Sequence, residues 1–267
     1  MPLVSAAILP HGGAAIPGFK EGKADFSEVR RGMKEAVGMV MSREPQTVVI
    51  ASPHNMRVEN NMAIVTAENY AGKLEEGSRK VTVARKCDVG LAKSIYAIAT
   101  KRRMPVVAVN FGTSSGPESK MPLDWGTMVP LWFFPRRVKV VVVTPSREIP
   151  WKDLMKMGEC IGQASRLTPT RVSFIASADQ AHAHSKSGPY GYDEAADEYD
   201  SRIVKLVKRD RLGSLMRFEP ALIERAKPDG FWQMLILMGA LKGKGLKPSC
   251  YSYSCPTYYG MLSAAYV

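Results

Sequence analysis

Short apolar runs separated by helical patterns constrain this chain more than any other feature of its sequence. Between and after these runs, apolar residues recur at the 3.6-residue spacing of a helix packed on one face. Strands that alternate with helices predict an α/β fold, a single-domain sandwich with a mainly parallel central sheet flanked by helices. The six predicted strands are Val4–Leu9, Thr47–Ala51, Met62–Thr66, Val106–Asn110, Val138–Thr144 and Val172–Ala176. The predicted helices are Phe26–Ser42, Gly90–Lys101, Trp151–Arg166, Asp193–Arg209 and Phe231–Leu241.

The organisation of the chain predicts one domain over residues 1–267, because no linker, internal repeat or low-complexity tract interrupts it. The segment Phe111–Leu131 is rich in Gly, Ser and Pro, and it is predicted to be a long ordered loop with a functional role. No apolar run approaches the roughly 20 residues of a membrane helix, and the first residues lack a basic leader. The four cysteines lack disulfide-framework or zinc-ribbon spacing. We therefore expect a cytoplasmic protein without a membrane partner.

The charge balance is strongly basic, with 37 Lys and Arg against 25 Asp and Glu and a net charge of +12. The positive residues are scattered along the chain and are not interleaved with aromatic residues, as they would be in a base-stacking platform. This distribution favours a solvated basic surface and predicts no nucleic-acid partner. Such a surface could still steer an anionic small molecule toward the protein.

The four histidines of the chain all follow predicted strands. His11 comes after the first strand, His54 after the second, and His182 and His184 after Val172–Ala176. In open α/β sheets, ligands bind in the crevice at the carboxyl ends of the strands. We therefore expect the histidines to share one cleft.

Imidazole groups gathered in this way predict a mononuclear metal site. Two histidines and one carboxylate, with open positions left on the ion, form the facial arrangement of non-haem Fe(II) oxygenases. A zinc hydrolase would use a similar set around an activated water, and spacing alone leaves both chemistries open. A further histidine off the metal would be available as a general acid or base.

The motifs around these histidines resemble those of the class III extradiol ring-cleavage dioxygenases, in particular their catalytic B-subunit-type domain. The same superfamily includes Memo-like proteins, which keep the fold with other activities. The segments that carry the resemblance are Leu9–Gly12, Ser52–His54, Leu123–Leu131, Ser177–His182, Trp232–Leu241 and Pro256–Met261.

The resemblance implies roles for particular residues. His11 and His54 match the two histidines that ligate Fe(II), with Zn or Mn as alternative metals, and His182 matches the catalytic histidine that takes a proton from the substrate hydroxyl. The substrates would be a small catechol- or aminophenol-type aromatic and O2. Asp229 is the preferred carboxylate ligand because it precedes Phe231–Leu241 at about the expected distance. The alternative third ligands are Glu219, Glu224 and Cys255.

One departure from the family pattern concerns Trp125, which stands where the D-H-G-T motif commonly has a second active-site histidine. Trp125 is predicted to form an apolar wall for the substrate or to mark a branch with a different substrate. Together with the open choice of third ligand, it also motivates the alternative of a Memo-like protein that binds metal without dioxygenase activity and has a partner-binding role. Asn55, His184 and Tyr190 are further candidates for substrate contact, each with a turn, surface or loop role as the alternative. Related enzymes often assemble, so we expect a homo-oligomer and consider a second subunit possible.

Overall fold

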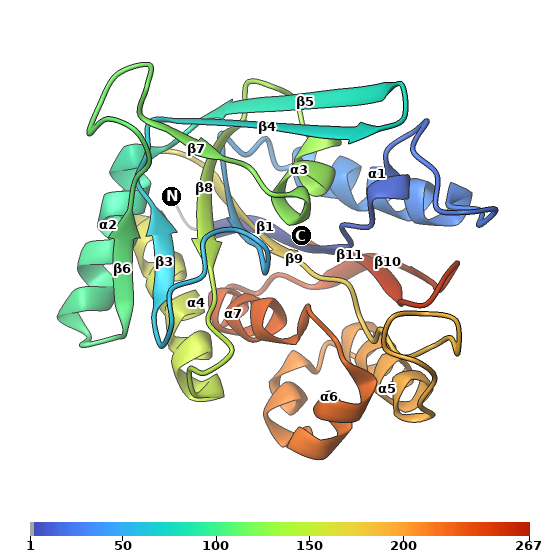
Figure 1. Cartoon of the computed structure of the whole chain (residues 1–267). Coiled ribbons are helices and arrows are strands. Elements are labelled where there is room, and N and C mark those ends of the chain that lie inside the picture. The colour runs from blue at the N-terminus through green and yellow to red at the C-terminus, as the bar shows by residue number, and fades with distance from the viewer. Residues whose placement is uncertain (1–2) are drawn as a thin grey trace.

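The computed structural model describes residues 3–267 and is built on a central sheet of eight strands (Figure 1). The strand order across this sheet is β10-β11-β1-β9-β2-β8-β3-β6. Strands β1, β9, β2 and β8 run parallel to one another. Strands β3 and β6 form a parallel pair that joins β8 antiparallel. At the other edge β11 pairs antiparallel with β1, and β10 pairs antiparallel with β11. The bounds are β1 Leu3–Leu9, β2 Thr47–Ala51, β3 Met62–Val65, β6 Val106–Val109, β8 Lys139–Thr144, β9 Val172–Ser177, β10 Pro248–Ser254 and β11 Met261–Tyr266.

Helices cover both faces of the central sheet (Figure 1). On one face, helices α4 and α7 pack on each other and against β1, and α5 lies against β10. On the other face, α1 packs on β1, β10 and β11. The helices are α1 Ser27–Met41, α2 Val89–Lys101, α3 Trp125–Trp132, α4 Trp151–Leu167, α5 Ala195–Lys208, α6 Pro220–Ala226 and α7 Phe231–Leu241, with short 3₁₀ turns at Gly13–Ala15 and Leu212–Arg217. The predicted α/β sandwich with a mostly parallel central sheet is confirmed.

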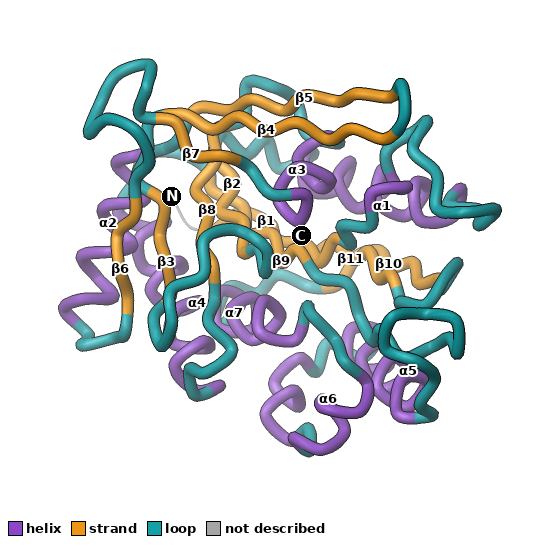
Figure 2. The backbone as a smooth tube through the Cα atoms, viewed as in Figure 1, coloured by secondary structure: helices purple, strands orange, loops and turns teal. Residues whose placement is uncertain are grey.

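A second sheet lies beside α3, away from α7, and the sequence pattern did not reveal it (Figure 2). It has three strands in the order β5-β4-β7. Their bounds are β4 Asn69–Glu76, β5 Arg79–Lys86 and β7 Lys120–Pro122. The hairpin of β4 and β5 carries many charged residues and is largely exposed, so it lacks the continuous apolar run that marks a buried strand.

The prediction of a loop over Phe111–Leu131 is wrong for its second half. Strand β7 and nearly all of helix α3 lie within that segment. The helix begins because the Asp124 side chain caps it, accepting hydrogen bonds from the backbone N–H of Thr127 at 2.9 Å and from the Thr127 hydroxyl at 2.7 Å. Six of its eight residues are buried, so packing stabilises a helix that is too short to persist alone.

The contact between α4 and α7 requires glycine on both helices. A methyl group at Gly239 would collide with the backbone carbonyl of Met155, and one at Gly158 would collide with that of Ile236. We expect Gly239→Ala to lower the free energy of unfolding by about 1–3 kcal/mol, because backbone atoms must move apart. Gly38→Ala, at an open position of α1, is the matched control and should stabilise the protein by about 0.5–1 kcal/mol. Urea denaturation measures both; equal effects would contradict the close packing.

Among the described residues, none of the helices combines the length and the apolar character that crossing a membrane requires.

Candidate metal centre

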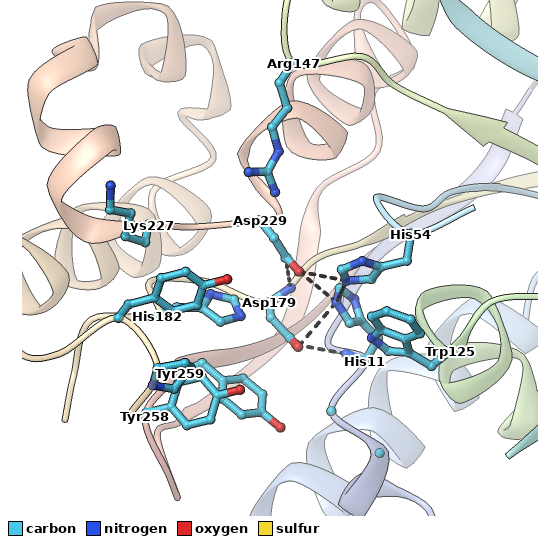
Figure 3. A pocket seen from close by; sticks show the side chains of 14 residues that line it. His11, His54, Trp125, Arg147, Asp179, His182, Lys227, Asp229, Tyr258 and Tyr259 are labelled. Atoms are coloured by element: carbon cyan, nitrogen blue, oxygen red, sulfur yellow. Dashed lines mark hydrogen bonds and ion pairs between the residues drawn. The ribbon is translucent and has the colours of Figure 1, made fainter. Parts of the chain in front are cut away.

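Three neighbouring strands of the central sheet place the histidines in one cleft. His11 follows the end of β1, His54 follows the end of β2, and His182 follows β9, which lies between the other two. Because these strands are parallel, their carboxyl ends open at the same edge of the sheet. Figure 3 shows the side chains of His11 and His54 on one side of the cleft and His182 on the other.

Three donor atoms converge at one point of this cleft. Asp229 Oδ2 lies 3.0 Å from His11 Nε2 and 3.1 Å from His54 Nε2, and the two imidazole nitrogens are 3.2 Å apart. Asp229 belongs to the short connection between α6 and α7, so a turn far along the chain completes a cluster that β1 and β2 begin. Two imidazoles and one carboxylate form a donor set that suits Fe, Zn or Mn.

A hydrogen-bond chain behind His11 sets the tautomer of its ring. The Ser177 hydroxyl donates to the backbone carbonyl of Gly126, which can only accept. The same hydroxyl oxygen, 2.9 Å from His11 Nδ1, is therefore the acceptor for an N–H on that nitrogen. With its proton on Nδ1, a neutral His11 presents the lone pair of Nε2 to the cluster, as a metal ligand must.

A second buried carboxylate, Asp179, stands directly beside the cluster. It accepts a hydrogen bond from the backbone N–H of His11 at 2.9 Å, and its own backbone N–H donates to Asp229 Oδ1 at 3.2 Å. Asp179 and Gly230 are in such close contact that a methyl group on Gly230 would overlap Ala178 and the carbonyl of Asp179. The turn that carries Asp229 is therefore held against the end of β9.

The electrostatics of the cluster favour a bound cation. Burial acts to lower the pKa of His11, but Asp179 and Asp229 outweigh it and raise that pKa to about 9. Burial acts to raise the pKa of Asp229, but His11 and His54 hold it well below its ordinary value, whereas burial raises the pKa of Asp179. Buried carboxylates of this kind are stabilised by a proton on His11 or by a metal ion in its place. The residues therefore fit a divalent metal.

His182 faces the metal cluster across the cavity. Its Nδ1 lies 2.9 Å from the carbonyl oxygen of Gln180, so Nδ1 carries a proton and Nε2 is the free acceptor. The ring of Tyr259 stacks on it with centroids 5.3 Å apart, and the Tyr259 hydroxyl donates to Glu21 at 2.6 Å. The orientation of His182 is therefore set by the backbone on one side and by an aromatic ring on the other.

The space between these groups, which we call the metal cavity, has a volume of about 320 Å³. Histidines and carboxylates line its floor, aromatic rings line its walls, and two cations lie among its lining residues (Figure 3). Its lining residues are His11, Gly12, Gly13, His54, Trp125, Arg147, Asp179, His182, Pro189, Tyr190, Lys227, Asp229, Tyr258 and Tyr259.

Two of the four predicted substrate contacts lie in this cavity. Trp125 stacks on the imidazole of His54, with centroids 4.1 Å apart, and its side chain is half exposed. Tyr190 lies edge-on to His182 at 5.8 Å. Asn55 lies outside the lining, because its amide donates to Asp124 at 2.9 Å and helps to hold the turn that carries His54. His184 also lies outside it, since Asp200 and Asp197 engage its ring.

The alternative third ligands lie elsewhere in the fold. Glu219 pairs with Arg202 at 2.8 Å on the surface, and Glu224 lines a different cavity. The thiol of Cys255 is directed to the carbonyl of Thr257, and burial raises its pKa to about 12, which disfavours the thiolate that binds metal. Asp229 is the carboxylate that the structure brings to His11 and His54.

Sequence reasoning gave no site role to the tyrosines and the two cations that line the metal cavity. Tyr258 and Tyr259 lie in a segment whose resemblance to the family was recognised without a role for either ring. Arg147 follows the end of β8, the strand next to β2, so its position after a parallel strand was a usable signal. Lys227 lies two residues before Asp229 and offered no signal of its own.

His184 stabilises the segment that carries His182. Burial acts to lower the pKa of His184, but its contacts with Asp200 and Asp197 raise it above 6.5. When folding raises the pKa of a group, protonation of that group stabilises the folded state. This contribution is fully present below the pKa of the unfolded state, and it is lost as the pH rises through the pKa of the folded state. We expect the difference in unfolding free energy between wild type and His184→Gln to be largest below pH 6.5 and to shrink above it. Urea titrations across this range measure it; a constant difference would contradict the ion pair.

The chain belongs to the LigB family, since the model of the catalytic LigB subunit of aromatic ring-opening dioxygenase matches residues 5–263. It is similar to protein CA_C1420 of Clostridium acetobutylicum, with 25% identity over 251 residues, which are 92% of this chain and 53% of that protein. The chain thus spans about half the length of this curated relative. Its fold is similar to that of uncharacterized protein JW3007 from Escherichia coli K12, with a TM-score of 0.61 and 16% sequence identity. The match covers 98% of this chain and 99% of that chain.

Proposed function

We propose that this protein is a non-haem Fe(II)-dependent extradiol dioxygenase that opens the ring of a catechol- or aminophenol-type aromatic with O2. The observation that carries the proposal is the convergence of His11, His54 and Asp229 on one point, with His182 facing them across a cavity. The size of the cavity suits a single substituted aromatic ring.

His11, His54 and Asp229 would hold the iron, and they leave coordination positions open toward the metal cavity. When bound, the iron supplies a template for the two substrates and a path for electrons between them. The Ser177 hydroxyl holds the imidazole of His11 in the tautomer that a ligand needs. Asp179 fixes the backbone of His11 and that of the turn carrying Asp229.

His182 supplies the base in this proposal. Its Nδ1 proton is committed to the carbonyl of Gln180, so Nε2 is ready to accept the proton of a substrate hydroxyl. The stacked ring of Tyr259 keeps the imidazole from rotating away. Taking up that proton would place it on Nε2 of His182 and leave the substrate oxygen as an anion.

Aromatic walls orient the substrate ring and limit the access of water. Trp125 covers one face of His54, and Tyr190 and Tyr258 stand near His182 on the opposite side. A planar substrate between these walls would be held with its hydroxyl groups toward the metal. Trp125 offers a ring face at the place where the family motif commonly has a hydrogen-bonding histidine.

The test is anaerobic reconstitution with Fe(II), followed by oxygen-electrode traces with catechols, protocatechuate-like acids and aminophenols. We expect O2 uptake that depends on iron and disappears in His182→Ala while iron stays bound. Turnover restored by zinc in place of iron would instead indicate a hydrolase. Size-exclusion chromatography with light scattering tests the further expectation of a homo-oligomer, with or without a second subunit.

A Memo-like metal-binding role without dioxygenase activity is the second candidate, and Trp125 is the observation that favours it. The indole stacks on His54 and, unlike an imidazole, cannot exchange a proton with a substrate near neutral pH. Stoichiometric iron binding without O2 uptake on any substrate would support this role. In that case we expect Trp125→His to gain uptake; an inactive variant with iron bound would show that the loss lies elsewhere in the site.

A further inference from the structure

Two cations mark the boundary between the metal cavity and a second cavity. Arg147 and Lys227 line both spaces. The second space, which we call the apolar cavity, has a volume of about 390 Å³, and its walls include Trp151, Ile223, Pro228 and Trp232, with Glu224 at its exposed edge. A molecule that fills both spaces would therefore lie against Arg147 and Lys227.

Neither cation forms an ion pair within the described part of the chain. No carboxylate among residues 3–267 lies within ion-pair distance of Arg147 or Lys227. Other arginines do form ion pairs, among them Arg57, Arg102 and Arg202. A divalent metal would balance the charges of Asp179 and Asp229, so these two carboxylates would not neutralise the cations. Glu148 interacts with Arg147 at longer range, but it also interacts with Arg57. The boundary is therefore suited to an anion brought by the ligand.

The fold holds the side chain of Arg147 and the backbone of Lys227 in place. The Arg147 guanidinium lies over the ring of Trp232, 4.5 Å from its centroid, a stacking that leaves the edge of the guanidinium free for hydrogen bonds. Figure 3 shows this group pointing into the metal cavity from its rim. Lys227 has a left-handed backbone with a φ of 55° at the end of α6, and the same turn leads to Asp229. One turn thus positions both a metal ligand and a cation.

We propose that Arg147 and Lys227 bind an acid group of the substrate, and that an apolar extension of the same molecule occupies the apolar cavity. The substrate class is then an aromatic acid larger than a single ring, with its hydroxyl groups at the metal and its carboxylate, or another singly charged acid group, at the boundary. This inference rests on the proposed function for the orientation of the ring. The affinity for the acid group rests on the two cations alone.

The experiment measures binding and not turnover. Metal-loaded protein under strict anaerobiosis is titrated by calorimetry with catechol, with 3-(3,4-dihydroxyphenyl)propionate, with the neutral amide of that acid, and with the acid bearing a butyl chain beside its carboxylate. Arg147→Gln and Lys227→Gln each remove one charge from the boundary. Lys152→Gln and Arg209→Gln are the matched controls, since each removes one exposed charge that forms no ion pair among the described residues.

We expect the acid to bind about tenfold more tightly than its amide, because a hydrogen-bonded charge pair typically contributes that much. Each boundary variant should remove most of this difference and leave the affinity for catechol unchanged, whereas the two controls should keep it. The butyl chain should tighten binding several-fold as it enters the apolar cavity.

The outcomes separate this inference from the proposed function. Equal affinity for acid and amide, or an equal loss in the control variants, overturns the assignment of Arg147 and Lys227. A butyl chain that weakens binding overturns the role of the apolar cavity. Preference for the acid that depends on both cations, together with no O2 uptake in air, would uphold the inference and count against the dioxygenase. If no probe binds at millimolar concentration, both are overturned.

Discussion

Replacing Asp229 with asparagine is expected to remove most of the bound metal and with it all measurable turnover. Asparagine keeps the shape of the side chain and can still accept from the backbone N–H of Asp179, so the turn before α7 should survive. It removes the one negative charge that contacts both His11 and His54. Loss of a residue that merely supports a ligand typically weakens metal binding 10- to 100-fold, so loss of the ligand itself should weaken it by about a hundredfold or more.

The alternative ligands provide matched controls for this prediction. Glu219→Gln, Glu224→Gln and Cys255→Ser should each retain a full complement of iron, because their side chains lie away from the cluster. Metal content by atomic absorption and affinity by competition with a chelator measure the effect. Full iron occupancy in Asp229→Asn would mean that another group completes the site.

The second large effect is expected in His182→Gln, where iron should remain bound while turnover falls by about 10²- to 10⁴-fold, the usual contribution of a positioned general base. A ring nitrogen of His182 lies within 4.8 Å of carboxylate oxygens of Asp179 and Asp229, but His182 does not belong to the group of His11, His54 and Asp229, so its removal leaves those three donors in place. Glutamine can still form hydrogen bonds but cannot take up a proton. The fall should therefore appear in kcat, with little change in the affinity for catechol under anaerobic conditions.

His184→Gln makes the same chemical change two residues further along the chain and serves as the control. His184 contacts Asp197 and Asp200 and does not line the metal cavity, so this variant should keep most of its turnover and lose stability instead. Paired kcat and iron measurements distinguish the two histidines. If His182→Gln retains wild-type kcat, the substrate proton leaves by another route.

Local patterns in the sequence predicted six of the eight strands of the central sheet and missed the edge strands β10 and β11. Strand β2 and helix α7 have the predicted bounds, and most of the other predicted elements differ by one or two residues at an end. Buried parallel strands are continuous apolar runs, so burial leaves a clear mark on such segments. The half-exposed hairpin of β4 and β5 and the short helix α3 left no such mark, because their stability comes from contacts with distant parts of the chain.

The sequence by itself determined that the histidines follow strands and that a metal site at the carboxyl edge of a sheet was the natural hypothesis. It could not determine the carboxylate, because Asp229 and His11 are 218 positions apart and the spacing between them does not encode a distance in space. Only the tertiary structure brought that turn to β1 and β2, moved Asn55 and His184 out of the cavity, and set Arg147 beside Lys227. Periodicity reports which face of an element is buried, whereas the partners of a side chain depend on how the layers pack.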